Sequence, residues 1–426
     1  MTSLAEPVTS TAPVATALAP SHESLAERFT GRRYLQLVLV LGAMSAIGPL
    51  TIDAYLPALP VLSAELNATD SQAQLTITGL LVGLGLGQLV IGPLSDAVGR
   101  RKPLLIGLAA HGLMSVLCAL APSITLLAVT RTLQGLAGAA VAVVAMAIVR
   151  DLFTGVRAAQ LLSRLMLVVG VAPILAPSIG SALMTLTSWR GIFVVLAATA
   201  VALFVLALFA LPETLPPVRR RAGNVRDSLR AYAGLFGDRV FVVMVLVSGL
   251  MFATLFAYIS GAPFILQELY SLTPAQFGLA FSVTALGLVL MTQLNPLLLR
   301  RITPVTALFV AVTVSALGAA ALVVTTATET GGLVGFLVPV FFIAAAAGLS
   351  FPNAPAIALN RHGEAAGSAA ALLGAAQFVI GGMIAPLVGA LGNGTPVPMA
   401  GVILGASSLA LVLMLVSHRR LAASQD

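Results

Sequence analysis

Charged residues are scarce in this chain. Only 9% of its 426 residues are Asp, Glu, Lys or Arg, whereas soluble globular proteins average about 25%. Hydrophobic residues make up 59% of the sequence, and the mean hydropathy is +1.04. So apolar a composition excludes a soluble protein, and the length therefore divides into membrane spans of about 20 residues rather than into soluble domains.

Cysteine is almost absent. The single residue, Cys118, lies in an apolar run, which excludes an intrachain disulfide and a cysteine metal cluster. The four histidines are scattered, so we expect no metal site and no cofactor. Residues 1–24 contain no Lys or Arg and have no apolar core, so the sequence does not indicate a secretory signal.

Long apolar runs are abundant. We predict twelve spans, at residues 35–62, 73–95, 103–121, 124–149, 161–186, 190–211, 240–266, 275–298, 304–326, 331–353, 367–390 and 397–417. One long charged segment divides them into six and six. The predicted domains are a disordered cytoplasmic tail at 1–33, a six-helix bundle at 34–211, a cytoplasmic linker at 212–238, a second six-helix bundle at 239–417 and a cytoplasmic tail at 418–426.

The positions of lysine and arginine predict the orientation. Nearly all 22 of them fall on one side of the predicted membrane, whereas loops such as SAELNATDSQA and QELYSLTPA carry none. Short basic loops are typical of the cytoplasmic side, so we expect both termini to be cytoplasmic. This topology explains the net charge of +7, and nucleic acid is not an expected partner.

One acidic residue stands out in the first span. Asp53 lies near the outer end of an apolar run, with Pro49, Pro57 and Pro60 around it. A carboxylate within a span costs at least about 2.5–3.5 kcal/mol unless it faces a wet cavity or a partner. The prolines also free backbone carbonyls, which protein or cavity water must satisfy. Asp53 is therefore the primary candidate for a proton site; the alternative is an interfacial residue that reaches outward to water.

The fourth span contains a cation. Arg131 has no short route to either membrane face, and Gln134 and Gly138 follow it at i+3 and i+7 on the same helix face. We expect this face to point at a cavity. The alternative is an arginine that donates hydrogen bonds to carbonyls between helices. His111, in the third span, is interpreted as a hydrogen-bonded packing residue.

Two segments are rich in glycine and proline. The loop GPLSDAVGRRKP places Asp96 where it can lie against a helix N-terminus, and Arg100 to Lys102 where they can bind an anionic leaflet. The fifth span contains VVGVAPILAPSIGSAL, in which small residues and prolines permit close helix approach and a bend. Its four notable positions are Gly170, Pro173, Pro177 and Gly180.

At these residues the chain resembles the major facilitator superfamily, specifically the twelve-span drug:proton antiporters of the bicyclomycin and chloramphenicol resistance type. The matching segments are TIDAYLPALP, GPLSDAVGRRKP, RTLQGLAGAAVAVVAMAIVRDL, APILAPSIGSAL and FPNAPAIALNRHGEAAGSAAALLGAAQFVIGG. The resemblance covers about residues 30–420. It implies an all-α polytopic membrane protein with the major facilitator fold, in which two six-helix bundles are related by pseudo-twofold symmetry.

The resemblance also implies roles for individual residues. Asp53 matches the acid implicated in protonation and drug binding, and Arg131 matches the arginine implicated in proton coupling. A conformational latch that holds the outward-open state is implied at Gly92, Asp96, Gly99, Arg100, Arg101 and Asp151. In it Arg100 would pair with Asp151, and Asp96 would face the start of span eleven near Gly367.

Two departures from the family pattern concern the signatures. The span-five signature reads Ala176-Pro177 and Gly180-Ser181 where the family usually has Gly-Pro and later Gly-Gly. The second-half loop NPLLLRRITP lacks the acid of its counterpart, so a latch there would rely on Arg300 and Arg301 alone.

The predicted function is proton-coupled antiport that exports amphipathic drugs by alternating access across a bacterial inner membrane, by a monomer that is not an enzyme and uses protons as its coupling ion. Polar residues are few in the spans, which favours a broad apolar drug site. The alternatives are a proton-coupled transporter of one metabolite, such as a sugar or amino acid, and a channel or receptor. The candidate substrate contacts are Asp53, Tyr55, Gln134, Tyr258, Phe264, Asn353 and Gln377, and Phe378 is a further aromatic residue in span eleven.

Overall fold

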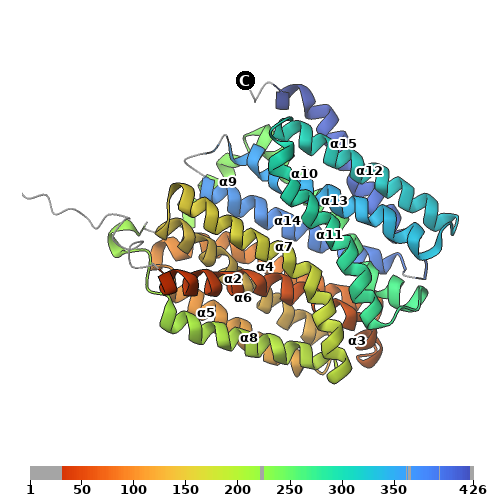
Figure 1. Ribbon diagram of the computed structural model, residues 1–426, viewed down its shortest axis with the longest axis horizontal. Coiled ribbons are helices and arrows are strands. Elements are labelled where there is room, and N and C mark those ends of the chain that lie inside the picture. The colour runs from red at the N-terminus through yellow and green to blue at the C-terminus, as the bar shows by residue number, and fades with distance from the viewer. Residues whose placement is uncertain (1–30, 221–224, 361, 363–365, 393, 423–426) are drawn as a thin grey trace, which may run out of the picture.

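The computed structural model describes residues 31–220, 225–360, 362, 366–392 and 394–422. Within these residues all regular secondary structure is helical. Twelve helical segments are long and apolar enough to cross a membrane, which confirms the predicted number of spans. Figure 1 shows them as two groups, one formed by α2 to α8 and the other by α10 to α15.

The N-terminal half contributes six spans, of which the first is broken into three pieces. The elements are α2 Gly31–Asp53, η1 Leu56–Ala58, α3 Leu59–Glu65, α4 Asp70–Val98, α5 Arg101–Ala119, α6 Ile124–Leu152, α7 Gly155–Leu186 and α8 Trp189–Ala210.

The C-terminal half follows a linker that contains two short helical elements. The linker elements are η2 Pro217–Arg219 and α9 Val225–Leu235. The spans are α10 Arg239–Phe264 with its π-helical extension η3 Ile265–Leu269, α11 Pro274–Leu298, α12 Pro304–Ala327, α13 Gly332–Leu359, α14 Ala366–Ala390 and α15 Val397–Ala422.

Several helices begin where the sequence supplies a capping side chain. In α4 the Thr69 side chain accepts from the Gln72 amide and the Gln72 side chain accepts from the Thr69 amide. The same reciprocal pair, Thr273 and Gln276, begins α11. Each pair satisfies two of the backbone donors that a helix start leaves free. The second span of each half is therefore fixed at its start by the same local signal.

The helix bounds differ from the predicted spans at a few ends. Span ten was predicted to end at residue 353, but α13 continues to Leu359 through Pro352 and Pro355. Prolines inside membrane helices are tolerated when neighbouring groups satisfy the freed carbonyls. Likewise α7 starts at Gly155, six residues before the predicted span, and α15 runs to Ala422, into the stretch expected to be a tail. The first helix begins at Gly31, within the predicted tail 1–33, whose residues 1–30 lie outside the described ones.

The two halves meet along two pairs of helices, α4 with α14 and α7 with α11. We call the end of the molecule that carries α3 the α3 end, and the end that carries α9 the linker end; they lie at the right and left of Figure 1. Neutral hydrogen bonds join the halves toward the α3 end. They run from Ser71 to the Pro386 carbonyl, Gln74 to Ser260, Thr78 to Gly382, Ser181 to Pro274, Gln267 to Pro57 and Ser282 to Ile174. The structure is therefore closed between the halves at the α3 end.

Candidate functional site

Asp53 is the last residue of α2, at the break in the first span. The residue is buried, with only 5% of its surface exposed. A turn at residues 54–55 follows it before η1 begins, in agreement with the proline-rich sequence. No hydrogen bond or ion pair joins the Asp53 carboxyl group to another described residue. The structure therefore places an acid at a helix break, buried and without a cationic partner.

The antiporter signature in α7 packs directly beside this break. A Cβ atom on Gly180 would lie 1.9 Å from the carbonyl oxygen of Ala54, the residue after Asp53, so only glycine permits this contact. Pro173 and Pro177 lie inside α7, which continues through both. A Cβ on Gly170 would lie 3.8 Å from Val289 of α11, an ordinary van der Waals distance. The signature thus contacts both the first span and the C-terminal half.

Arg131, in α6, is fully buried. Its Nη1 donates to the Thr51 carbonyl oxygen at 3.0 Å and to Gln134 Oε1 at 2.9 Å. Its Cζ lies 4.6 Å from the ring centre of Tyr55 and 5.6 Å from that of Phe193, both within cation–π range. Its Nε and Nη2 have no hydrogen-bond partner among the described residues.

Arg131 donates to a carbonyl of another helix, as the packing alternative expects, and its Nε and Nη2 have no described partner. Its role in proton coupling stays a prediction. No ion pair joins it to Asp53 among the described residues, although its carbonyl partner Thr51 is two positions away in the chain. A carboxyl group and a guanidinium cation are thus buried near the same helix break without forming a described ion pair.

A chain of hydrogen bonds extends from this arginine to α5. Gln134 Nε2 donates to Ser115 Oγ at 2.7 Å, and Ser115 Oγ donates to the His111 carbonyl. The Thr51 hydroxyl donates to the Ile47 carbonyl, so at the 3.1 Å contact between His111 and Thr51 the imidazole Nε2 is the donor. The expected hydrogen bond of His111 is present, and no sequence pattern indicated that its partner is Thr51, whose carbonyl accepts from Arg131.

The C-terminal candidates form separate contacts. Tyr258 donates to Thr284 Oγ1 at 2.8 Å, because that threonine gives its own proton to the Phe281 carbonyl. Asn353 donates to Asn295 Oδ1 at 2.7 Å, and Gln377 donates to Ser248 Oγ at 2.5 Å. Phe264 is buried in the same hydrophobic cluster as Tyr55 and Tyr258. The structure therefore does not gather all the predicted substrate contacts into one group.

An aromatic cluster lies beside Gln377. The ring of Phe252 lies 5.5 Å from Phe256, 4.6 Å from Phe351 and 5.4 Å from Phe378. The rings come from α10, α13 and α14, and a Cβ on Gly381 of α14 would lie within 3.4 Å of Phe252 and Phe256. Sequence analysis named only Phe378 of this set. The i, i+4 spacing of Phe252 and Phe256 on one helix face was the available signal.

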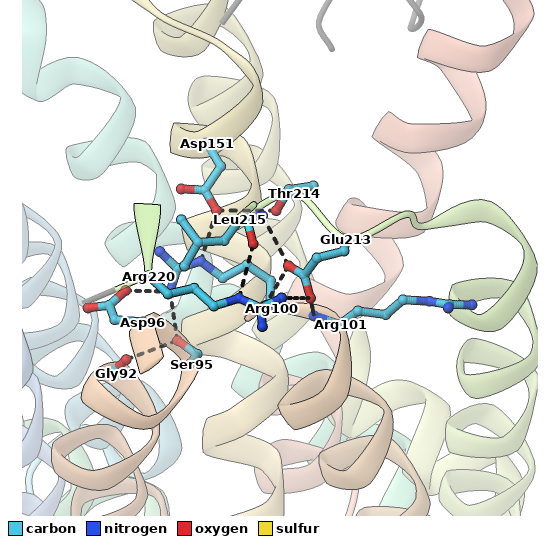
Figure 2. A network of polar contacts seen from close by, with 10 residues as sticks. All are labelled: Gly92, Ser95, Asp96, Arg100, Arg101, Asp151, Glu213, Thr214, Leu215 and Arg220. Atoms are coloured by element: carbon cyan, nitrogen blue, oxygen red, sulfur yellow. Dashed lines mark hydrogen bonds and ion pairs between the residues drawn. The ribbon is translucent and has the colours of Figure 1, made fainter. Parts of the chain in front are cut away.

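Arg100 is the centre of the loop between α4 and α5, which Figure 2 shows. Its Nε donates to Asp151 Oδ2 at 2.8 Å, and its Nη1 donates to Ser95 Oγ at 2.8 Å and to Asp96 Oδ1 at 2.5 Å. Burial opposes the guanidinium charge, but the hydrogen bonds and charges of Asp151 and Asp96 outweigh it and raise the pKa of Arg100. The pairing with Asp151 is the one that the resemblance implied.

Glu213, at the start of the linker, completes this network. Its carboxylate accepts from the backbone amides of Arg100 at 2.8 Å and Arg101 at 3.3 Å, at the N-terminus of α5 (Figure 2). A Cβ on Gly99 would lie 2.4 Å from Glu213 Oε2, and the φ of Gly99 is +98°, so glycine is required twice over. Sequence analysis missed Glu213 because it lies more than a hundred residues away in the chain.

The remaining latch positions have local partners. The Gly92 carbonyl accepts from Ser95 Oγ at 2.9 Å, and Arg101 Nη2 donates to the Leu208 carbonyl at 2.6 Å. Asp96 makes no hydrogen bond to α14 among the described residues, and a Cβ on Gly367 would meet nothing within 4 Å. In this state, closed at the α3 end, the network therefore lies within the N-terminal half and the linker.

Comparison with known proteins gives relatives along most of the chain. The uncharacterized MFS-type transporter YdgK of Bacillus subtilis is 37% identical over 375 residues, which is 88% of this chain and 93% of that protein. A bicyclomycin resistance protein homolog of Haemophilus influenzae is 27% identical, covering 85% of this chain and 91% of its own. The multidrug resistance protein MdtL of Escherichia coli is 28% identical, covering 90% and 96%.

The fold and the family agree with these relatives. A crystal structure of a D-xylose-proton symporter superposes with a TM-score of 0.70 at 15% identity, covering 89% of this chain and 97% of that one. The Major Facilitator Superfamily model matches residues 39–386. The resemblance to drug-efflux transporters that the motifs indicated is confirmed, and the expectation of a transporter rather than an enzyme is confirmed with it. The chain belongs to the Major Facilitator Superfamily.

Proposed function

We propose that this transporter exports amphipathic drugs from the cytoplasm in exchange for protons, by alternating access in the bacterial inner membrane. In this proposal both termini are cytoplasmic, the linker end faces the cytoplasm, and residues 34–211 and 239–417 are the two moving bodies of a monomer. The names of two relatives, a bicyclomycin resistance protein homolog and a multidrug resistance protein, support the class of substrate.

The observation that carries the proposal is the setting of Asp53. The carboxyl group is buried at a helix break without a cation bonded to it. A charge held in such a place is costly, so the group is neutralised by a proton or by a cation that moves in. A site that accepts either a proton or a competing ligand can exchange one for the other, because each opposes the occupancy of the other.

Arg131 supplies the second half of the exchange. Its Nε and Nη2 are donors without a described partner. Its Nη1 donates to the carbonyl of Thr51, which lies two residues before Asp53 in the chain. In this proposal these donors stabilise the negative charge that forms when Asp53 loses its proton. Proton movement at Asp53 is thereby linked to the packing of α2 against α6.

The membrane potential is sufficient for this work. Each proton that moves inward through 100 mV releases about 2.3 kcal/mol, enough for about a fiftyfold gradient of a neutral solute at one-to-one coupling. The Arg100 network at the linker end, with Asp96, Asp151 and Glu213, is proposed to stabilise the arrangement of the loop as the two halves tilt.

The cluster of Phe252, Phe256, Phe351 and Phe378 favours an apolar cargo. A sugar or amino-acid site needs several free and convergent hydrogen-bonding groups. In the C-terminal half the amides of Gln377 and Asn353 instead donate to protein partners. The metabolite alternative therefore has less support, and the likeness to the xylose symporter concerns the fold alone.

The test is transport by the purified full chain in proteoliposomes. With an imposed pH gradient, uptake of an amphipathic drug such as chloramphenicol into inside-out oriented vesicles should follow the gradient and collapse when a protonophore is added. Uptake that ignores the gradient would contradict antiport. Gradient-dependent uptake of sugars or amino acids, with no drug transported across a panel of toxic compounds, would instead establish the metabolite alternative.

A further inference from the structure

Four helix prolines share one arrangement. A proline inside a helix has no N–H, so the carbonyl four residues earlier loses its donor. In each of four cases a hydroxyl group from another helix lies within hydrogen-bond distance of that carbonyl. Thr292 and Thr325 share their proton with carbonyls of their own helices. The pairs are Tyr232 to Leu89 before Pro93 at 3.1 Å, Thr325 to Gly335 before Pro339 at 2.8 Å, Thr292 to Gly348 before Pro352 at 3.0 Å, and Thr78 to Gly382 before Pro386 at 2.7 Å.

These four bonds differ in what they join. Thr292 and Thr325 each act inside the C-terminal half, between α11 or α12 and α13. Tyr232 joins the linker helix α9 to α4. The bond from Thr78 joins the two halves, because Thr78 belongs to α4 and Gly382 to α14. It is the member of the set that a relative movement of the halves would break.

The surroundings of Thr78 make this bond specific. Gly382 is buried, and a Cβ on it would lie 2.9 Å from Leu81 Cβ, so α4 and α14 are in close contact there. Thr78 also lies 3.4 Å from the Gln74 carbonyl, but its bond to Gly382 is the shorter by far. Ser71, Gln74 and Thr78, at i, i+3 and i+7, form one face of α4 that donates to carbonyls of the opposite half.

We propose that Thr78 is a positioning residue of the transport cycle, which holds the carbonyl freed by Pro386 while the α3 end is closed and releases it when the halves separate there. The inference rests on the proposed alternating access. In the closed state the Thr78 hydroxyl replaces the missing helix donor, and after separation water takes that place. Pro386 therefore makes a carbonyl of α14 available to α4, and Thr78 uses it as a contact present in one conformer.

Removal of the hydroxyl should act on the closed state alone. Thr78→Val keeps the shape of the side chain but leaves the buried Gly382 carbonyl without a donor, which is more costly than an exposed loss. The ratio of open to closed molecules at the α3 end should rise about tenfold. Thr78→Ser restores the hydroxyl and should return the ratio to that of the unmodified chain.

The experiment measures this ratio by double electron–electron resonance, which gives the distribution of distances between two spin labels. Spin labels are attached to Leu186→Cys at the end of α7 and Ala327→Cys at the end of α12, both exposed, in the full chain with Cys118→Ala. Distances are measured in nanodiscs without drug or proton gradient. The result can therefore be interpreted even if the proposed drug or proton assignment is wrong. Conversely, a negative result for Thr78 does not contradict the proposed function.

Matched controls separate a conformational role from general weakening of a helix. Thr292→Val and Thr325→Val remove hydroxyls from the same kind of carbonyl inside one half and should leave the distance distribution unchanged. In a Pro386→Ala background the residue at 386 regains its N–H, so adding Thr78→Val should change the ratio little. If Thr78→Val alone folds poorly, the double variant, compared with Pro386→Ala, still tests the inference.

Two results would overturn the inference. One is a folded Thr78→Val protein whose distance distribution equals that of the unmodified chain. The other is an equal shift in Thr292→Val or Thr325→Val, because the effect would then follow from any lost proline-associated hydrogen bond.

Discussion

The two halves repeat one polar pair in different surroundings. Tyr55 pairs with Thr76 at 2.9 Å in the N-terminal half, and Tyr258 pairs with Thr284 at 2.8 Å in the C-terminal half. The ring of Tyr55 lies under the Arg131 guanidinium, whereas the ring of Tyr258 stacks on Phe281 at 5.6 Å. The same scaffold thus holds a cation in one half and apolar surface in the other.

The loops at the linker end differ in the same sense. Arg100 in the first half is held by several acids, whereas the corresponding loop of the second half contains Arg300 and Arg301 without an acid. That a second-half latch relies on those two arginines alone stays a prediction. His362, after α13, lies 3.2 Å from Asp238, the N-cap of α10. The comparison suggests a division of labour, with permanent charges in the first half and apolar contacts in the second.

Asp53→Asn should have the largest effect on this division. The amide cannot exchange a proton, so proton-driven accumulation should fall from about fiftyfold at 100 mV to no gradient. Drug accumulation in vesicles and resistance of an efflux-deficient host measure it. Asp53→Glu is the control that keeps the acid. Unchanged resistance in cells with a folded Asp53→Asn protein would remove this residue from the mechanism.

Arg131→Lys tests whether charge alone is sufficient in the first half. Lysine retains the charge but lacks the planar guanidinium, whose Nη1 donates to the Thr51 carbonyl and Gln134 while its face lies over the Tyr55 ring. Drug-induced proton release should fall about tenfold or more, because hydrogen bonds to a charged group are lost in a buried site. Arg131→Ala should abolish it at similar expression. If Arg131→Ala vesicles still release protons on drug addition, the arginine serves packing only.

Phe252→Ala should give a smaller and different change in the second half. Loss of the central ring of the aromatic cluster should raise KM for bulky aromatic drugs about tenfold while the proton-to-drug ratio stays the same. Competition between drugs in the same vesicles measures both quantities. A change in the ratio itself would mean that the two halves do not divide their roles. Phe342→Ala, an exposed ring of α13, is the matched control.

The paired Tyr55→Phe and Tyr258→Phe variants should give the smallest effect. Each removes one buried hydroxyl and should lower the free energy of unfolding by about 1 kcal/mol. Thermal unfolding in detergent compares them. Only Tyr55→Phe, beside Arg131, should also alter the pH dependence of transport. Equal changes in transport for both variants would contradict the contrast between the halves.

Much of the fold followed from the sequence, because lipid allows few alternatives. Spans of sufficient apolar length have to be helices, since only helices satisfy their own backbone groups in lipid. The number of spans and the division into two halves were therefore predictable. Helix ends were less so: α13 passes Pro352 and Pro355 because a hydroxyl from another helix replaces one missing donor, and a single segment does not encode its neighbour.

The candidate site shows the same limit. Asp53 and Arg131 were found as isolated charges in apolar runs, and the Gly180 signature was found by its motif. Their relation was not: Gly180 touches the backbone of Ala54, and Arg131 holds the carbonyl of Thr51. Glu213 and His111 were missed or undervalued because their partners lie far away in the chain.

The sequence by itself determined that this protein spans a membrane twelve times in two halves. The reason is that a chain with so few charged residues and such long apolar runs folds in a lipid bilayer and not in water. Only the tertiary structure decided which buried groups meet. Hydrogen bonds act over about 3 Å, and helix packing brings such atoms together from positions that no local pattern connects.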